Sequence, residues 1–301
     1  MTDLKRNTHP QLELLQSTDW VDYELLDSGA GARLERFGPY IFERPEHQAV
    51  WQRSFSEARW QSAHATFQPT GEESGGRWQF RQPINPTWVM QYKGLKFQAQ
   101  ASSSRHLGVF PEQAAHWDWI EEHIQAANRP VRVLNLFGYT GLASLAAARA
   151  GASVTHVDAS KKSLAWARQN QELSGLGDRP IRWLVDDAYK FVRREARRGT
   201  HYEGLILDPP KFGRGPEGQV WEFFESLPDL LQTCRALLSR QPLFIVLTAY
   251  AIRASALSIY YAVEEMTAGL DGSLTAGELV LTERSAGRLL SMAIYTRWSA
   301  T

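Results

Sequence analysis

The sequence predicts an α/β protein with two parts: a small β-rich domain at residues 1–104 and a helix-covered, mostly parallel sheet at residues 105–301. In the second part, apolar runs alternate with helical segments, which is the pattern of βαβ units. These runs are apolar throughout because strands of a parallel sheet are buried on both faces. Before residue 104, short strand-like segments are separated by turns containing glycine or proline.

The elements of the second part can be assigned in chain order. A helix is expected through residues 117–120. Buried parallel strands are expected at the apolar runs 131–137, 154–157, 181–185, 205–207 and 243–247. Two further strands, at residues 278–281 and 289–298, are expected to form an antiparallel pair at one edge of the sheet.

Composition limits the class of protein. The 33 Lys and Arg residues balance 33 Asp and Glu residues, so no domain-wide basic field attracts nucleic acid. The single cysteine, Cys234, cannot form an internal disulfide and is interpreted as a buried residue of a helix. No apolar run approaches the ~20 residues of a membrane helix, and no Cys/His cluster has zinc spacing. We expect a soluble cytoplasmic protein without a metal or a membrane partner.

One local basic surface remains possible. Five cations share one face of the helix expected after residue 188, and they either contact phosphates or form a solvated face. They are Lys190, Arg193, Arg194, Arg197 and Arg198.

A glycine-bearing turn follows the first buried strand and opens a helix near Leu142. Gly138 and Gly141 leave room for a cofactor close to the backbone, and Thr140 offers a hydroxyl beside it. The turn lies at the carboxyl edge of the sheet, where such folds bind ligands. Thr140 stands where the second glycine of a nicotinamide fingerprint would meet a pyrophosphate. The turn therefore favours a cofactor without phosphates.

Carboxylates end the next two strands. Asp158 lies seventeen residues after Gly141, where it could accept both hydroxyls of a ribose, which implies an adenosine ligand. Asp187, favoured over Asp186, could accept a hydrogen bond from an adenine amino group. The alternative for Asp187 is that it caps the helix that starts near Ala188.

The fourth strand ends in Asp208-Pro209-Pro210. Two prolines fix the backbone, so the Asp208 carboxylate and the Pro209 carbonyl can both accept hydrogen bonds from a nucleophilic nitrogen and orient its lone pair. Turn chemistry alone is the alternative interpretation. The following loop, residues 211–221, is predicted to be a mobile lid with aromatic residues that either stack on a base or anchor the loop. Its candidate substrate residues are Lys211, Phe212 and Arg214.

These segments resemble the class I S-adenosylmethionine methyltransferases over about residues 105–301. Residues 135–141 and 208–212 are particularly similar to the bacterial 23S ribosomal RNA large-subunit methyltransferases that modify cytosine or guanine. The resemblance implies a Rossmann-like, seven-stranded methyltransferase sheet, S-adenosylmethionine as cofactor, and RNA as substrate. It adds Asn135, Phe137, Phe110, Glu112 and Gln113 to the expected cofactor contacts, the last three through similarity of residues 106–113 to the family's Gly-x-x-x-Asp-Gln-Arg stretch. Glu112 replaces the Asp of that stretch, and Ala114 replaces its Arg.

Two departures from the family narrow the chemistry. Cytosine-C5 members need a cysteine after the fifth strand, where this chain has Leu-Thr-Ala-Tyr-Ala at residues 247–251. Direct transfer to a ring or exocyclic nitrogen of an RNA base, with ribosomal RNA favoured, is therefore the predicted reaction. The ~20 residues before Trp20 leave no room for the N-terminal RNA-binding module that relatives often carry. The alternatives are a protein or small-molecule methyltransferase, or a non-catalytic cofactor-binding protein.

Overall fold

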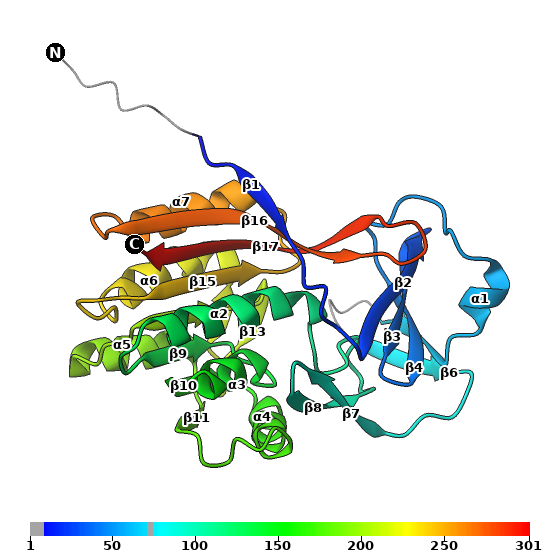
Figure 1. Cartoon of the computed structure of the whole chain (residues 1–301), viewed down its shortest axis with the longest axis horizontal. Coiled ribbons are helices and arrows are strands. Elements are labelled where there is room, and N and C mark those ends of the chain that lie inside the picture. Colours follow the sequence, from blue (N-terminus) through cyan, green and yellow to red (C-terminus); the bar gives the residue numbers. More distant parts are fainter. Residues whose placement is uncertain (1–8, 71–74) are drawn as a thin grey trace.

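The computed structural model describes residues 9–70 and 75–301, and Figure 1 shows a helix-covered sheet beside a separate group of short strands. The first eight residues of the expected N-terminal domain lie outside the described residues. In the described ranges, no helix is long and apolar enough to cross a membrane.

The N-terminal part is built from two small sheets. A five-stranded sheet has the order β2-β3-β4-β5-β6, and β7 and β8 form a hairpin beside it. The strands are β2 (Tyr23–Gly29), β3 (Ala32–Phe37), β4 (Tyr40–Pro45), β5 (Ala65–Pro69), β6 (Gly76–Phe80), β7 (Thr87–Tyr92) and β8 (Leu95–Gln100). A short helix, α1 (Glu57–Gln61), follows β4. Buried aromatic side chains fill this part; Phe42 stacks on Trp88 with ring centroids 5.6 Å apart.

The second part is an eight-stranded sheet with the order β1-β16-β17-β15-β12-β9-β10-β11. Its central strands are parallel, and β16 and β17 form the expected antiparallel pair. The strands are β1 (Leu12–Leu15), β9 (Arg132–Leu136), β10 (Ser153–Asp158), β11 (Ile181–Val185), β12 (Gly204–Leu207), β15 (Phe244–Ala249), β16 (Gly272–Thr282) and β17 (Leu289–Ala300).

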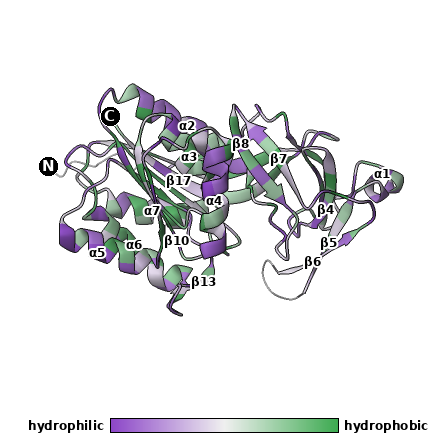
Figure 2. Cartoon of the chain, turned by 90° about the horizontal axis from the view of Figure 1, so that it is seen from below, coloured by the Kyte–Doolittle hydropathy of each residue, from purple (hydrophilic) through white to green (hydrophobic). Residues whose placement is uncertain are grey.

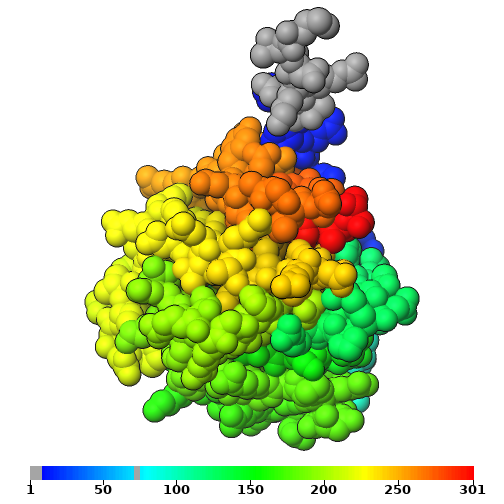
Figure 3. Space-filling view, turned by 90° about the vertical axis from the view of Figure 1, so that its left-hand side faces the viewer, coloured from blue at the N-terminus to red at the C-terminus, as the bar shows by residue number. Residues whose placement is uncertain are grey.

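The eighth strand corrects the expectation of seven. β1 comes from the segment assigned to the N-terminal domain, but it pairs in parallel with β16, with Leu12 opposite Ala276. Figure 3 looks at the end of the molecule away from the N-terminal strands and shows this blue segment against the orange and red C-terminal elements. The edge of β16 presents unpaired backbone groups, and β1 satisfies them. Four residues are too few to produce a recognisable periodic pattern.

Six helices cover the two faces of the sheet. On one face, α2 and α3 pack against Val133, Val154 and Val246, whereas α5, α6 and α7 pack against the opposite face. Figure 2 shows strands such as β10 as hydrophobic and much of α5 as hydrophilic. The helices are α2 (Ala114–Ala126), α3 (Leu142–Arg149), α4 (Lys161–Leu173), α5 (Ala188–Arg198), α6 (Phe223–Arg235) and α7 (Ala256–Met266).

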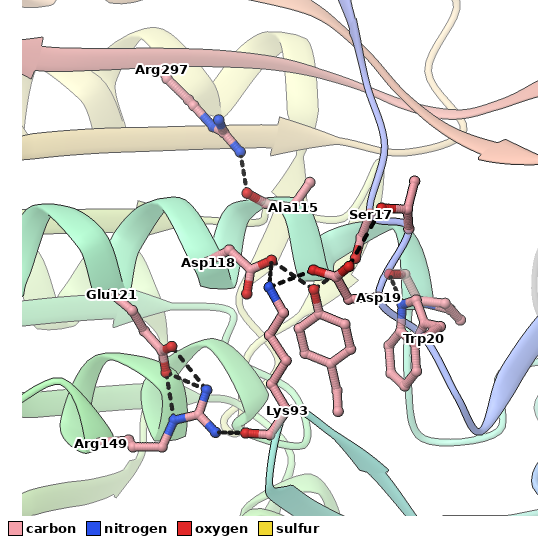
Figure 4. Close-up of polar contacts among 12 residues, drawn as sticks. Ser17, Asp19, Trp20, Lys93, Ala115, Asp118, Glu121, Arg149 and Arg297 are labelled. Carbon is pink, nitrogen blue, oxygen red and sulfur yellow. Dashed lines mark hydrogen bonds and ion pairs between the residues drawn. The ribbon is translucent and has the colours of Figure 1, made fainter.

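The chain crosses between the two parts more than once. Figure 4 shows Lys93, in the β7–β8 turn, pairing with Asp19 at 2.6 Å and with Asp118 of α2 at 2.9 Å. Trp20 donates its indole N–H to the carbonyl of Pro111 at 2.9 Å. These contacts hold the N-terminal segment against the start of the C-terminal part.

The tip of the β16–β17 hairpin provides a second crossing, which Figure 1 shows as the red hairpin reaching the N-terminal strands. Glu283 forms a bridge with Leu25 and accepts a hydrogen bond from Ser28 Oγ at 3.0 Å. The backbone N–H of Arg284 donates to the Leu25 carbonyl at 2.9 Å. A division at residue 104 therefore describes the sequence order, while β1 and this hairpin tie the two parts together.

Candidate active site

A cleft of about 1180 Å³ lies between the two parts of the molecule. On one side it is bounded by the carboxyl ends of β9, β10 and β12, where the strand order reverses and doubly wound sheets bind ligands. The N-terminal part supplies the other wall. Eleven of the residues selected from the sequence line this cleft: Phe110, Glu112, Phe137, Asp158, Asp187, Asp208, Pro209, Pro210, Lys211, Phe212 and Arg214.

The loop between β9 and α3 has a strained backbone. Phe137, Tyr139 and Gly141 adopt φ angles of 59°, 50° and 84°, in the left-handed region that non-glycine residues avoid. A Cβ atom on Gly138 would lie 2.3 Å from the His156 ring, and one on Gly141 would lie 2.9 Å from Ala167 Cβ. Buried neighbours of the loop therefore leave no space for a side chain at either position, and neither glycine lines the cleft.

Asn135 and Thr140 support this loop from inside. The Asn135 amide donates to Ser144 Oγ at 2.9 Å, and the Thr140 hydroxyl donates to the Gly108 carbonyl at 2.7 Å. Both side chains are 2% exposed and do not line the cleft, although the sequence had suggested that they contact the cofactor. The Thr140 contact fixes the loop against the segment that carries Phe110 and Glu112.

Asp158 holds the other side of the loop. Its Oδ2 accepts from the Tyr139 N–H and its Oδ1 from the Ser160 N–H, each at 2.8 Å. A carboxylate oxygen has two lone pairs, so each can accept one more hydrogen bond. Burial raises the pKa of this carboxyl above its ordinary value. Two hydroxyls donated by a ribose would satisfy the remaining lone pairs.

Asp187 caps α5, as the alternative interpretation proposed. Its Oδ1 accepts from the backbone N–H of Lys190 at 2.9 Å, while the residue also lines the cleft. The neighbouring Asp186 forms an ion pair with Arg194. Capping and a contact with adenine use different lone pairs of the Asp187 carboxylate, so the two roles are compatible.

The Asp208-Pro209-Pro210 segment lies at the end of β12. Trp221 donates its indole N–H to the Pro210 carbonyl at 2.6 Å, which anchors the segment. The Pro209 carbonyl accepts no hydrogen bond from the described part of the chain. Gln113 lies behind Asp208 and donates to its Oδ2 at 3.3 Å, without lining the cleft itself. Burial, and then the nearby Glu112 carboxylate, raise the pKa of Asp208 to about 8.

The segment predicted as a lid forms a small hairpin, β13 (Phe212–Arg214) paired with β14 (Val220–Glu222). Its two aromatic residues differ in exposure. Trp221 is buried and packs on Phe137 with ring centroids 5.0 Å apart, so it anchors the hairpin. Phe212 is 51% exposed at the cleft and is the aromatic side chain available to a substrate.

Three of the five cations on the basic face of α5 form ion pairs. Lys190 pairs with Glu217 at 2.7 Å, Arg198 with Glu195 at 3.0 Å, and Arg194 with Asp186. Arg193 lies over the Tyr189 ring. These contacts favour the solvated-face interpretation over a phosphate-binding surface.

The sequence analysis did not identify several residues that line the cleft. Tyr250 follows β15, at the position examined for a cysteine, and its ring packs 5.0 Å from that of Phe110. Arg33 and Arg44 line the opposite wall and both bind the buried Glu35, at 3.1 Å and 2.7 Å. The position of Tyr250 after a strand could have identified it. Nothing in the strand pattern of the N-terminal part marks the arginines as cleft residues.

These side chains fit an adenosine-bearing cofactor. Asp158 provides acceptors for ribose hydroxyls, and the rings of Phe110 and Tyr139, 5.8 Å apart, form an apolar surface in the cleft. In a dinucleotide-binding fold, a glycine at the position of Thr140 lets the backbone approach the pyrophosphate. The buried Thr140 side chain occupies that position here, so this loop lacks the pyrophosphate-binding site of such folds.

Comparisons with known proteins identify the family. The family model for S-adenosylmethionine-dependent methyltransferases matches residues 46–253. A crystal structure of a SAM-dependent methyltransferase from Agrobacterium tumefaciens superposes with a TM-score of 0.92 at 46% identity, covering 97% of this chain and 96% of that one. The crystal structure of SMU.776 complexed with SAH has a TM-score of 0.72 at 18% identity over 93% of this chain and 76% of its own, which shows the shared fold.

Two curated relatives are named ribosomal RNA large subunit methyltransferase I. The Aeromonas salmonicida protein is 31% identical over 154 residues, which is 51% of this chain and 35% of the relative. The Shewanella amazonensis protein is 28% identical over 190 residues, 63% of this chain and 45% of the relative. The chain thus covers less than half of each relative's length. The protein belongs to the S-adenosylmethionine-dependent methyltransferase family.

Proposed function

We propose that the protein transfers a methyl group from S-adenosylmethionine to a nitrogen of an RNA base, with ribosomal RNA as the favoured substrate. The observation that carries this proposal is the pair of acceptors at the end of β12. The Asp208 carboxylate and the Pro209 carbonyl, which has no partner in the described part of the chain, both belong to a rigid segment. They can hold an N–H-bearing nitrogen with its lone pair directed at the reactive methyl group.

Other residues of the cleft have supporting roles in this proposal. Asp158 holds the ribose, Asp187 binds the adenine amino group, and Phe110 and Phe137 exclude water from the cofactor. The cofactor supplies an electrophilic methyl on a positively charged sulfur. Phe212 and Arg214 at the cleft mouth contact the substrate base and its phosphate.

The absence of a suitable cysteine supports transfer to nitrogen over covalent chemistry at cytosine C5. Cys234, the sole cysteine of the chain, is fully buried in α6 within the hydrophobic core. Burial raises the pKa of its thiol to about 12, so the reactive thiolate does not form near neutral pH. A free, reduced cysteine and a ribosomal RNA substrate are consistent with a cytoplasmic location, which we also propose.

Labelled methyl transfer tests the substrate. Total RNA and total protein from cells lacking the gene are incubated with the enzyme and methyl-labelled S-adenosylmethionine. We expect label in one RNA species, reduced at least ~100-fold by Asp208→Ala because orientation of the nitrogen is lost. Asp178→Ala, a change at an exposed carboxylate outside the cleft, is the matched control and should leave labelling unchanged. Label confined to protein, or undiminished in Asp208→Ala, would contradict the proposal.

A protein or small molecule is the second candidate substrate. The observation in its favour is that three of the five cations on the basic face of α5 are engaged in ion pairs, which leaves fewer for phosphates. Salt dependence separates the candidates, because RNA binding weakens steeply with added salt and binding of a neutral substrate does not.

A further inference from the structure

Two buried carboxyl groups from different elements line the cleft. Glu112 lies in a single 3-10 turn, η1 (Pro111–Gln113), and is 2% exposed, while Asp208 ends β12. Both line the cleft, and Gln113, the neighbour of Glu112, donates to Asp208 at 3.3 Å. Burial, and then the Glu112 carboxylate, raise the pKa of Asp208. Ionisation of one of these buried acids therefore opposes ionisation of the other.

Tyr250 completes this group. Its ring packs 5.0 Å from that of Phe110, it lines the same cleft, and its hydroxyl is buried without a hydrogen bond to the described residues. Burial, and then the Glu112 and Asp208 carboxylates, raise the pKa of this phenol above its ordinary value. Arg33, Arg44 and Tyr250 act on the Glu112 carboxyl from neighbouring elements, and Glu112 in turn acts on Tyr23 and Asp208.

The arginines only partly offset the negative charge of the pair. Arg44 makes two hydrogen bonds of 2.7 Å to Glu35, and Arg33 pairs with Glu35 and with Glu46. Their charges are largely neutralised by those carboxylates. Burial dominates at Glu112, and the pKa of its carboxyl is raised.

We propose that Glu112 and Asp208 act as one unit that takes up the proton released when an N–H nitrogen of the substrate is methylated, with Tyr250 as a positioning residue beside the unit. This inference rests on the proposed transfer to nitrogen. It assigns Glu112 a role in proton uptake, beyond the cofactor contact expected from the sequence.

The charges and atoms of the step balance. A bond forms between the substrate nitrogen and the methyl carbon, the carbon–sulfur bond breaks, and its electron pair stays on sulfur. Before the step, the positive sulfur favours ionisation of both carboxyls, and the pair carries two negative charges. Afterwards the sulfur is neutral, and two carboxylates in a water-poor site repel each other, so the pair binds the proton that leaves the nitrogen. The net charge of the site is unchanged.

This proposal specifies the substrate nitrogen. A nitrogen that carries a proton, whether an exocyclic amine or a ring N–H such as N1 of guanine, releases a proton when it is methylated, whereas the N7 atom of guanine has none to release. An acid pair that accepts a proton is useful only for the first kind. The proposal therefore requires an N–H-bearing nitrogen as the methyl acceptor and excludes guanine N7.

Calorimetry of cofactor binding tests the pair without the substrate. Binding of S-adenosylmethionine and of S-adenosylhomocysteine is measured at about pH 6.5, where the amino group of both ligands is protonated. Buffers that differ in ionisation enthalpy are compared, because the change in binding enthalpy between them gives the number of protons released. We expect the positively charged ligand to release about one proton more than the neutral product, because it ionises the pair fully. Equal proton release with both ligands would overturn the proposal.

Matched variants give the test its specificity. Glu112→Gln keeps the shape of the side chain and should abolish the difference in proton release, while binding of S-adenosylhomocysteine shows that the variant is folded. Glu278→Gln removes another carboxylate of the cleft wall and should retain the difference. Loss of the difference in both variants, or in neither, would count against the pair.

RNA labelling with the same preparations separates this proposal from the proposed function. Label in RNA together with equal proton release would overturn the acid pair and leave RNA methylation standing. A proton difference without RNA labelling would support the acid pair and overturn the RNA substrate.

Discussion

At the scale of single residues, the structure requires glycine at position 138 for a different reason from the one that the sequence suggested. The sequence suggested that its missing side chain admits the cofactor, whereas a Cβ atom there would lie 2.3 Å from the buried His156 ring. Burial lowers the pKa of His156 to about 3, so this ring is neutral. The identity of a buried neighbour depends on long-range packing, which spacing within the motif does not contain.

Gly138→Ala should therefore destabilise the folded protein. We expect a loss of ~1–3 kcal/mol in the free energy of unfolding, because the added methyl group overpacks the space beside His156. Denaturant titration measures this loss. The control is Gly177→Ala, where the new Cβ would meet only the flexible end of Glu172 at 3.2 Å. Equal stability of the two variants would contradict the packing explanation.

Asp208 gives a prediction about pH. Its pKa in the folded protein is raised to about 8 from an ordinary value of 3.8, so between these values the folded state binds more protons than the unfolded state. The contribution of this group to stability therefore falls as pH rises from about 4 to about 8. Thermal unfolding of the cofactor-free protein should show Asp208→Asn becoming progressively more stable than wild type across this window. A constant difference between the two proteins would show that Asp208 is not desolvated.

At the scale of elements, the sequence predicted what periodicity can reveal. The five parallel strands and the β16–β17 pair lie where the sequence analysis placed them, because each is long enough to show a pattern of apolar residues. β1 and the β13–β14 hairpin were not predicted, since three or four residues carry no periodicity. Their positions depend on the sheet edge and on the Trp221 anchor, which exist only in the folded chain.

β1 depends on a glycine in its partner strand. A Cβ atom on Gly277 would lie 1.7 Å from the Glu13 carbonyl oxygen, so Gly277→Ala should displace β1 from the sheet edge. Backbone amides of residues 12–15 should then exchange with solvent at least ~10-fold faster, measured by hydrogen exchange, because local opening becomes easier. Amides of β9, inside the sheet, are the internal control and should keep their protection. Unchanged exchange in β1 would show that the strand tolerates the methyl group.

At the scale of the whole molecule, the two parts are connected by contacts that the sequence order conceals. β1 lies in the C-terminal sheet, the β16–β17 hairpin reaches Leu25 and Ser28, and Lys93 pairs with Asp118. The cleft requires both parts, since Arg33 and Glu46 form the wall opposite Asp208. Sequence analysis could identify the acids at the strand ends but not this wall, which arises from the packing of distant segments.

These connections predict that damage to the N-terminal core weakens the whole molecule. Glu35 is fully buried and binds Arg44, Arg33 and the Tyr23 hydroxyl, so Glu35→Gln leaves two buried guanidinium groups undercompensated. We expect a loss of ~3–5 kcal/mol in the free energy of unfolding. Glu57→Gln, at an exposed ion pair of the same domain, should cost at most ~1 kcal/mol.

The unfolding transition shows whether the two parts of the molecule unfold together or independently. If the crossing segments couple the two parts, Glu35→Gln lowers one unfolding midpoint, and tryptophan fluorescence and loss of S-adenosylhomocysteine binding coincide. If the parts were independent, fluorescence would show an early transition of the N-terminal strands while the α/β sheet stayed folded. Coupling would mean that the contacts that stabilise the fold also hold the N-terminal wall of the cleft in place. The same contacts would then determine both substrate binding on that wall and the position of Glu112.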